Sequence, residues 1–167
     1  MDARTGSPKT VDMRALALDL LLEAERGTEY ENTLLKGTLD KYDYLNGRDK
    51  AFLKRLVDGV TERRLQLDYV LEQFSSLPVR KMKPLIRCVL RMGAYQILFM
   101  DGVPDSAACN EAVKLVKMRH FAQLSGFVNG VLRKLCSQKN ALVWPDREKE
   151  PVRFLSVRYS MPEWIVR

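Results

Sequence analysis

The sequence predicts an all-α protein, and three of its features lead to that class. Apolar residues recur at helical spacing through most of the first 139 residues, whereas the alternation that marks a strand is nearly absent. Capping residues and glycines stand where the periodic stretches begin and end. The 167 residues, of which 46% are hydrophobic, suffice for one sizeable core.

Two helices are expected at the start of the chain. Thr10 and Asp12 are suited to capping the first one. That helix should run to about Arg26, because Gly27 can adopt the left-handed conformation that ends helices. A second helix is expected over residues 30–41.

The third helix should begin at Asn46, whose side chain can cap it. Asp49 then lies in the first turn, where a carboxylate interacts favourably with the helix dipole. One face is apolar at the spacing i, i+3, i+4, i+7: Leu53, Leu56, Val57 and Val60. The pattern continues to Phe74, and we interpret it as a helix that bends near Gly59. These stretches form one helical half.

Pro78 and Pro84 mark the entry to a second helical half. Between residues 85 and 97 the apolar positions fall within about 140° of arc on a helix, which predicts a core helix. The basic residues beside this arc are expected to form an outward edge: Arg80, Lys83, Arg87 and Arg91.

Two further helices are expected to complete this half. Asp105 or Ser106 can cap the first of them, after Gly102 and Pro104 end the preceding helix. Its inward positions would be Ala108, Ala112, Leu115 and Val116. The last helix is expected from about Ala122 to Ser137, with a similar apolar face.

The character of the sequence changes after these helices. The stretch NALVWPDREKEP is polar, contains two prolines and lacks periodicity, as a connector would. RYSMPEWIVR then resembles the beginning of a new element, because its proline and glutamate suit a first helical turn. We therefore predict one domain over residues 1–139, followed over residues 140–167 by a linker and the start of a further region in a longer protein.

Positive charge is concentrated in the middle of the chain. Residues 78–139 hold 11 basic and 3 acidic side chains, a net charge of +8, whereas residues 1–77 carry −2 and residues 140–167 carry +1. A solvated surface would explain such a cluster, but its local concentration favours a polyanionic partner, since phosphates attract cations and release counterions on contact.

Nothing in the sequence favours a membrane partner. The leucine-rich stretch near the start is interrupted by Asp12, Arg14 and Asp19, which a secretory signal would not tolerate. The uncharged run Met92–Met100 is much shorter than the roughly 20 residues that span a bilayer. We therefore predict a cytoplasmic protein.

The residues that could carry catalysis are few. Three cysteines lie far apart, at neither metal-ligand nor redox spacing, and are expected to be buried thiols: Cys88, Cys109 and Cys136. His120, the single histidine, stands at an expected helix end, where capping or phosphate contact suits it better than a role as base. The sequence predicts no catalytic, cofactor-binding or metal-binding residue.

Two polar residues are expected to serve the structure. Glu111 has no second carboxylate to form an acid and base pair with, so it should hydrogen-bond to neighbouring groups. Asn129 stands in a helix, where asparagine has poor propensity. It is expected to hydrogen-bond to Asn110 or to the loop at Val103 and Pro104.

Four segments in order carry a resemblance to a known family: LRMGAYQILF, VP, CNEAVKLVK and GFVNGVLRKL. They resemble the all-helical NusB family, whose members bind ribosomal RNA sequences as antitermination factors. The same fold occurs as the amino-terminal domain of ribosomal RNA methyltransferases of the RsmB (Sun) type. Two further segments resemble these methyltransferases more closely than they resemble the antitermination factors: NGRDKAFLKRLVDGVTERRLQLDYVL and RYSMPEWIVR.

The resemblance implies more than the spacing does. It implies two three-helix halves and a small-subunit ribosomal RNA target. In full-length relatives, a later domain binds S-adenosylmethionine and methylates carbon 5 of a cytosine. That domain would be this chain's own C-terminal partner, and the chain alone is expected to be inactive. Whether the isolated domain forms a weak homodimer is left open.

Arg14 matches one basic position of the family's arginine-rich amino terminus. We hypothesise that it cooperates with the basic cluster of the second half in contacting RNA phosphates. The predicted RNA-binding residues are Arg14, Arg80, Lys83, Arg87, Lys114 and Lys117.

Three hypotheses remain at this point. The first is an RNA-binding accessory domain of a small-subunit ribosomal RNA cytosine methyltransferase. The second is a free-standing antitermination factor that binds leader RNA with a ribosomal protein. The third is a docking module that orients a catalytic domain and contacts RNA little.

Overall fold

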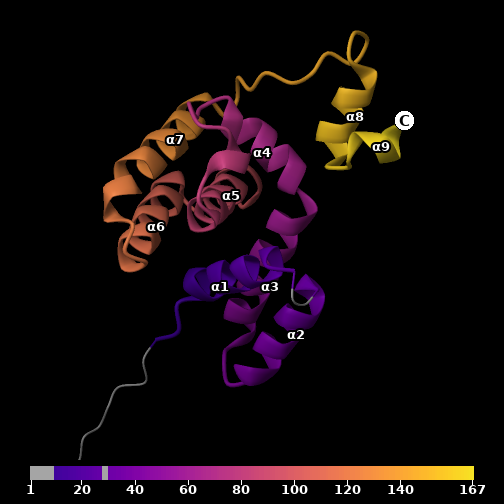
Figure 1. The fold of residues 1–167 in the computed structure, drawn as a ribbon. Helices are drawn as coiled ribbons and strands as arrows, with labels where there is room; N and C mark the ends of the chain where they lie inside the picture. Colours follow the sequence, from indigo (N-terminus) through magenta and orange to yellow (C-terminus); the bar gives the residue numbers. More distant parts are fainter. Residues whose placement is uncertain (1–9, 28–29) are drawn as a thin grey trace, which may run out of the picture.

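The computed structural model describes residues 10–27 and 30–167. Every regular element in these ranges is helical, which confirms the predicted class (Figure 1). The longer elements are α1 (Met13–Glu25), α2 (Glu31–Lys41), α3 (Gly47–Glu62), α4 (Arg64–Glu72), α5 (Pro84–Phe99), α6 (Asp105–Met118), α7 (Ser125–Gln138) and α8 (Pro151–Tyr159). The short ones are η1 (Val79–Lys81), η2 (Ala122–Leu124) and α9 (Glu163–Val166).

The first half of the molecule contains α1, α2 and α3, and its helix ends agree with the sequence. The Asp12 carboxylate accepts hydrogen bonds from the backbone N–H groups of Arg14 and Ala15, at 2.9 and 3.2 Å. Gly27 ends α1 with a φ of +74°. The Asn46 side chain accepts a hydrogen bond from the Asp49 N–H at 2.8 Å and so caps α3. The predicted caps Asp12 and Asn46 are confirmed, whereas Thr10 precedes the cap of α1 and does not serve as it.

The break between α3 and α4 differs from the prediction. It lies at Arg63, whose φ of −105° and ψ of 17° interrupt the helix, and not near Gly59. Gly59 is buried within α3, and a Cβ atom there would overlap the ring of Tyr95 on α5. The glycine therefore permits a close approach of two helices, and does not bend one.

Helix α5 lies at the centre of the fold, where it contacts α1, α3, α4, α6 and α7 (Figure 1). Ten of its residues are buried, in agreement with the predicted core helix. Leu132 of α7 packs so close to Gly93 that a larger residue at position 93 would displace it. The three helices α5, α6 and α7 make the second half, which α4 joins to the first.

Two expected helix starts are shifted. Asp105 is the first residue of α6 and not its cap, and its carboxylate accepts a hydrogen bond from Lys139 Nζ at 2.9 Å. The last predicted helix divides into η2 and α7, with the change of geometry at Ser125.

The segment after Lys139 contains a helix that the sequence did not predict. Residues 140–150 form the expected connector, and α9 begins at Glu163 as expected, but α8 lies between them. Helix α8 packs against α4, and α9 packs against α8. The division of the chain into domains at residue 139 stays a prediction.

Three kinds of contact attach this segment to α4. The Gln73 side chain exchanges two hydrogen bonds with the Val143 backbone, each 3.1 Å long. The Trp144 and Tyr69 rings stack with centroids 6.0 Å apart. The Ser160 hydroxyl accepts from the backbone N–H groups of Leu65 and Gln66. It thereby caps the first turn of α4, which has no side-chain cap of its own.

None of the helices in residues 10–27 and 30–167 combines the length and apolarity needed to cross a bilayer.

Candidate nucleic-acid interface

The six predicted RNA-binding residues fall into two groups in the structure. Four are exposed: Arg80, Lys83, Lys114 and Lys117. The other two, Arg14 and Arg87, are partly buried and contact neighbouring helices.

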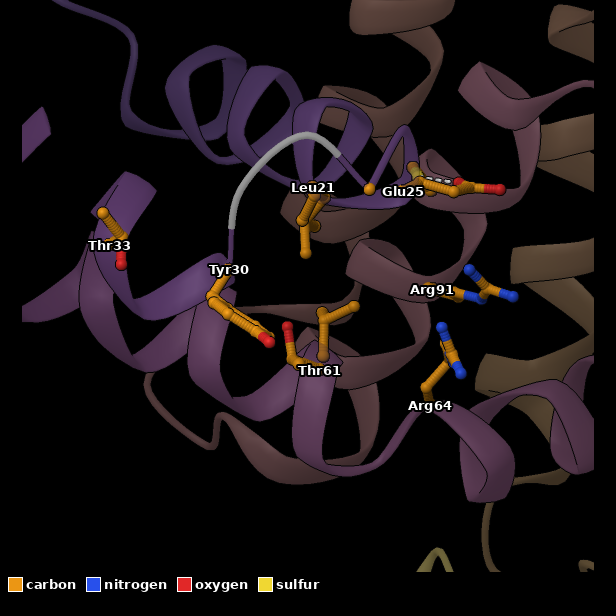
Figure 2. Close-up of a pocket in the computed structure, with 11 residues that line it drawn as sticks. Leu21, Glu25, Tyr30, Thr33, Thr61, Arg64 and Arg91 are labelled. Carbon is orange, nitrogen blue, oxygen red and sulfur yellow. Dashed lines mark hydrogen bonds between the residues drawn. The ribbon is translucent and has the colours of Figure 1, made fainter. Parts of the chain in front are cut away.

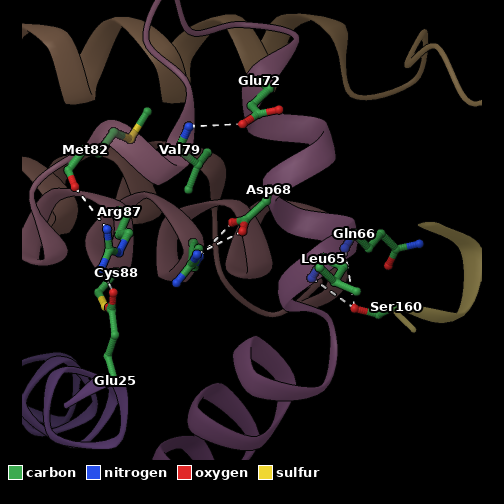
Figure 3. A network of polar contacts seen from close by, with 11 residues as sticks. Glu25, Leu65, Gln66, Asp68, Glu72, Val79, Met82, Arg87, Cys88 and Ser160 are labelled. Atoms are coloured by element: carbon green, nitrogen blue, oxygen red, sulfur yellow. Dashed lines mark hydrogen bonds and ion pairs between the residues drawn. The ribbon is translucent and has the colours of Figure 1, made fainter. Parts of the chain in front are cut away.

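Arg87 lies at the boundary between the two halves. Its guanidinium forms an ion pair with Glu25 of α1 and donates a hydrogen bond to the Met82 carbonyl at 3.1 Å (Figure 3). Its side chain is 20% exposed. We expected Arg87 to point outward as part of a basic edge, and this expectation is wrong. The ion pair with Glu25 on α1 holds the Arg87 side chain between the helices.

Arg91, expected on the same edge, is also turned inward. Its Nε and Nη2 atoms donate to the two carboxylate oxygens of Asp68, at 2.7 and 2.9 Å, and join α5 to α4. Charge-assisted pairs of this bidentate form have a well-defined geometry. With a side-chain exposure of 12%, Arg91 serves mainly the contact between these helices.

Arg14 contacts the far end of α5. Its Nε donates to the Gln96 side chain at 2.8 Å, and its guanidinium lies 5.1 Å from the centroid of the Phe52 ring. Gln96 follows Lys83 by thirteen residues, which corresponds to about 20 Å along a helix axis. Arg14 is therefore not brought together with the cations at the start of α5.

Of the exposed cations, Lys83 at the start of α5 lies close to the segment that follows α6. Lys83 Nζ lies 5.6 Å from the centroid of the Phe121 ring, and Phe121 follows the end of α6. Lys114 and Lys117 are spaced i, i+3 on α6, so they project from one side of it. We call the following residues the basic surface: Arg80, Lys81, Lys83, Lys114 and Lys117.

The basic surface differs from the arginines of α5 in its pairing. Within the described residues, none of its five cations forms an ion pair. Lys81 is not among the RNA-binding residues predicted from the sequence. It belongs to the basic surface because it is exposed in η1, between Arg80 and Lys83.

Other cations near the basic surface are paired. Arg119, at the end of α6, forms an ion pair with Asp19 of α1 at 2.7 Å. Arg133 of α7 donates to the side-chain oxygens of Asn110 and Asn129, at 2.9 and 3.3 Å. The expected contact of Asn129 with Asn110 is thus replaced by a bridge through Arg133.

The cysteines lie closer together than the sequence indicated. The Sγ atoms of Cys109 on α6 and Cys136 on α7 are 3.6 Å apart. Burial, with the hydrogen bond to Cys109, raises the pKa of Cys136 to about 12. Burial also raises the pKa of Cys88, which donates to Glu25. Cys136 is only partly buried, contrary to expectation, but a protonated thiol is a poor nucleophile.

His120 lies at a helix end, as predicted. It follows α6 in the left-handed conformation, with a φ of 67°, and its side chain is exposed. Within residues 10–27 and 30–167, no three histidine, cysteine, aspartate or glutamate side chains gather as a metal site requires.

Comparison with known sequences identifies the fold. The sequence model of the NusB family matches residues 11–137, from before α1 to the last turn of α7. The chain belongs to the NusB family.

Relatives of this NusB-family chain include two kinds of protein. It is 36% identical, over 95% of its length, to a probable ribosomal RNA small subunit methyltransferase B from Bacillus subtilis (strain 168). It is 32% identical, over 78% of its length, to the transcription antitermination protein NusB of Pseudarthrobacter chlorophenolicus. The chain spans 35% of the methyltransferase relative's length and 94% of the antitermination protein's.

Solved structures have the same fold. A NusB from T. maritima is 26% identical and superposes with a TM-score of 0.65 over 75% of this chain and 88% of its own. A structure of antitermination factors NusB and NusE in complex with dsRNA gives a TM-score of 0.67 at 23% identity, over 75% of this chain and 93% of that one. At that identity, the likeness shows the fold alone.

Proposed function

We propose that this NusB-family domain binds ribosomal RNA as an accessory domain of a small-subunit ribosomal RNA methyltransferase. In this role the basic surface contacts RNA phosphates, and a catalytic domain elsewhere in a longer protein binds S-adenosylmethionine and methylates a cytosine at carbon 5. The chain described here supplies RNA affinity and no catalytic group. The proposed target places the protein in the cytoplasm.

The extent of the matches supports the methyltransferase branch. The family model ends at residue 137, but the match to the Bacillus subtilis methyltransferase covers 159 residues. A Synechocystis protein of the same name matches over 93% of the chain, whereas the antitermination relative matches over 78%. The additional similarity therefore extends into the segment that α8 and α9 occupy.

The observation that carries RNA contact is that the basic surface forms no ion pair with any residue in the part of the chain that the structure describes. The charges of Arg87 and Arg91 are largely neutralised by the carboxylates they pair with, so these arginines attract a phosphate only weakly. Lys83, Lys114 and Lys117 have no acidic partner among the described residues. Lysine side chains of this kind fix the position of a nucleic acid through its backbone and release counterions.

Salt-dependent binding tests the proposal. We expect the chain to bind a structured fragment of small-subunit ribosomal RNA, with an affinity that falls linearly with salt on logarithmic axes. Replacing Lys83, Lys114 and Lys117 together by alanine should lower the affinity at low salt by about tenfold or more. It should also reduce the salt slope by about 2 to 3, because each phosphate contact contributes about 0.7 to 0.9.

The matched control removes three exposed cations elsewhere, by Lys36→Ala, Arg48→Ala and Lys149→Ala. It should retain most of the affinity. A triple lysine variant that remains folded and binds RNA like the unmodified chain would contradict phosphate contact by the basic surface. It would favour the docking hypothesis, in which the domain only orients a catalytic domain.

A second candidate function is that of a free-standing antitermination factor that binds leader RNA with a ribosomal protein. This function is favoured by the match to the antitermination relative, which extends over 94% of that protein's length. Sequencing the gene beyond the codon for Arg167 distinguishes the two. A stop codon soon afterwards supports antitermination, and several hundred further codons that encode a methyltransferase support the accessory domain.

A further inference from the structure

A pocket separate from the basic surface opens between the two halves of the molecule. Its volume is about 690 Å³, and its lining comes from all five of the helices α1 to α5 and the residues beside them. Figure 2 shows Tyr30 and Thr61 on one side of it and Arg64, Arg91 and Glu25 on the other. The volume lies within the range of about 300 to 1,000 Å³ that small-molecule sites occupy.

One part of the pocket offers apolar and aromatic contact. Leu21 of α1 and Val60 of α3 are buried core residues that line it. The Tyr30 side chain is 87% exposed, so its ring is available to a ligand. A planar group could lie against this ring and the aliphatic side chains, as nucleic-acid bases do on aromatic side chains of proteins.

Another part of the pocket offers positive charge. The Arg64 side chain is exposed, lines the pocket and, within the described residues, forms no ion pair. Arg91 engages Asp68 through Nε and Nη2, which leaves its Nη1 group for another acceptor. The Glu25 carboxylate is balanced by Arg87. Among the described residues that line this pocket, the guanidinium of Arg64 is therefore the charge that no carboxylate balances.

We propose that this pocket binds one unpaired ribonucleotide. Its phosphate would lie at Arg64 and the free edge of Arg91, and its base would lie against Tyr30 beside Leu21 and Val60. A base in a duplex is stacked on both faces and cannot enter, so the pocket selects nucleotides in loops, bulges or single strands. The inference rests on the proposed function in one respect, which is that the nucleotide belongs to an RNA strand. A free nucleotide has the same phosphate and base and is the alternative source.

Two variants of the whole chain test the site without disturbing the core, since both residues are exposed. Arg64→Ala removes the unbalanced charge, and Thr61→Trp fills the pocket. We expect each to weaken binding of a single-stranded decaribonucleotide by about tenfold, measured by fluorescence anisotropy, and to leave binding of the corresponding duplex unchanged. A base that stacks on an aromatic side chain contributes to the binding free energy, so a variant that keeps the base out of the pocket should lose about tenfold in affinity.

The matched control is Arg48→Ala, which also removes one exposed arginine from a helix. Arg48 lies thirteen residues before Thr61 on α3, about 20 Å along the helix axis, so single-strand affinity should stay within about twofold. Tyr30→Ala, at a highly exposed position, should reproduce the loss through stacking alone. Thermal unfolding monitored by circular dichroism verifies that each variant is folded.

Titration with adenosine and uridine 5′-monophosphate distinguishes the sources. If either mononucleotide binds as tightly as the decaribonucleotide does, and Thr61→Trp abolishes that binding, the pocket is assigned to free nucleotides. Loss of oligonucleotide binding without measurable mononucleotide binding assigns it to an RNA strand. Both results support the nucleotide site. If Arg64→Ala and Thr61→Trp bind the single strand like the unmodified chain, or lose duplex binding equally, the site is refuted.

The two proposals fail separately. Replacement of Lys83, Lys114 and Lys117 should weaken duplex and single-strand binding alike. If only the pocket variants lose affinity, the basic surface is refuted and the pocket stands. If only the lysine variant loses affinity, the pocket is refuted and the basic surface stands.

Discussion

The arginines of α5 and the cations of the basic surface look alike in sequence but differ in the fold. Arg87 and Arg91 face Glu25 and Asp68 on neighbouring helices and are 20% and 12% exposed. Lys117 and its neighbours face solvent. The difference teaches that a basic arc beside an apolar helix face can serve two purposes, and that the acidic residues of adjacent helices decide which.

The largest expected effect comes from breaking the more buried of these pairs. Arg91→Met leaves the Asp68 carboxylate partly buried without its partner, which should lower the free energy of unfolding by about 2 to 4 kcal/mol. Urea unfolding measures the loss. The double variant Arg91→Met with Asp68→Leu should recover most of it, because an unpaired charge no longer remains. Duplex RNA affinity of the folded fraction should not change.

The second prediction compares Arg87 with Arg80 directly. Arg87→Ala should lower the free energy of unfolding by about 1 to 2 kcal/mol, because Glu25 loses its ion pair, and should leave duplex RNA affinity unchanged. Arg80→Ala should leave stability within about 0.5 kcal/mol and weaken RNA binding a few-fold. The distinction between the two groups would collapse if Arg87→Ala reduced RNA affinity more than Arg80→Ala did.

The smallest expected effect concerns the C-terminal segment. Ser160→Ala removes the hydroxyl that accepts from the Leu65 and Gln66 N–H groups, which should cost about 1 kcal/mol, as loss of a helix cap does. Cleavage by a protease within residues 140–167 should become faster. Ser137→Ala is the control, since that hydroxyl donates to the Lys134 carbonyl of its own helix. Equal cleavage rates would show that Ser160 does not hold the segment on α4.

Local patterns were sufficient to predict most of the fold. Asp12, Gly27 and Asn46 mark helix ends through interactions within a few residues, so their roles could be deduced without tertiary information. Helix α8 was missed because only Ser156 and Val157 are buried in it, and two buried positions give no periodic apolar face. The break at Arg63 was misplaced because Gly59 serves a contact with Tyr95 of another helix.

The candidate sites were less predictable than the fold. The composition of residues 78–139 indicated a polyanionic partner, but only contacts between helices separate Lys83 from Arg87. The pocket proposed to bind a nucleotide could not be predicted, because Tyr30, Thr61 and Arg64 have no shared motif. They meet only when the first five helices assemble.

The bond from Ser160 to α4 has a consequence for synthesis. The hydroxyl that completes the first turn of α4 lies 94 and 95 residues after the two amides it serves. While the ribosome is still translating the intervening helices, water must occupy that position. The turn that joins the two halves is therefore completed only after Ser160 has left the exit tunnel.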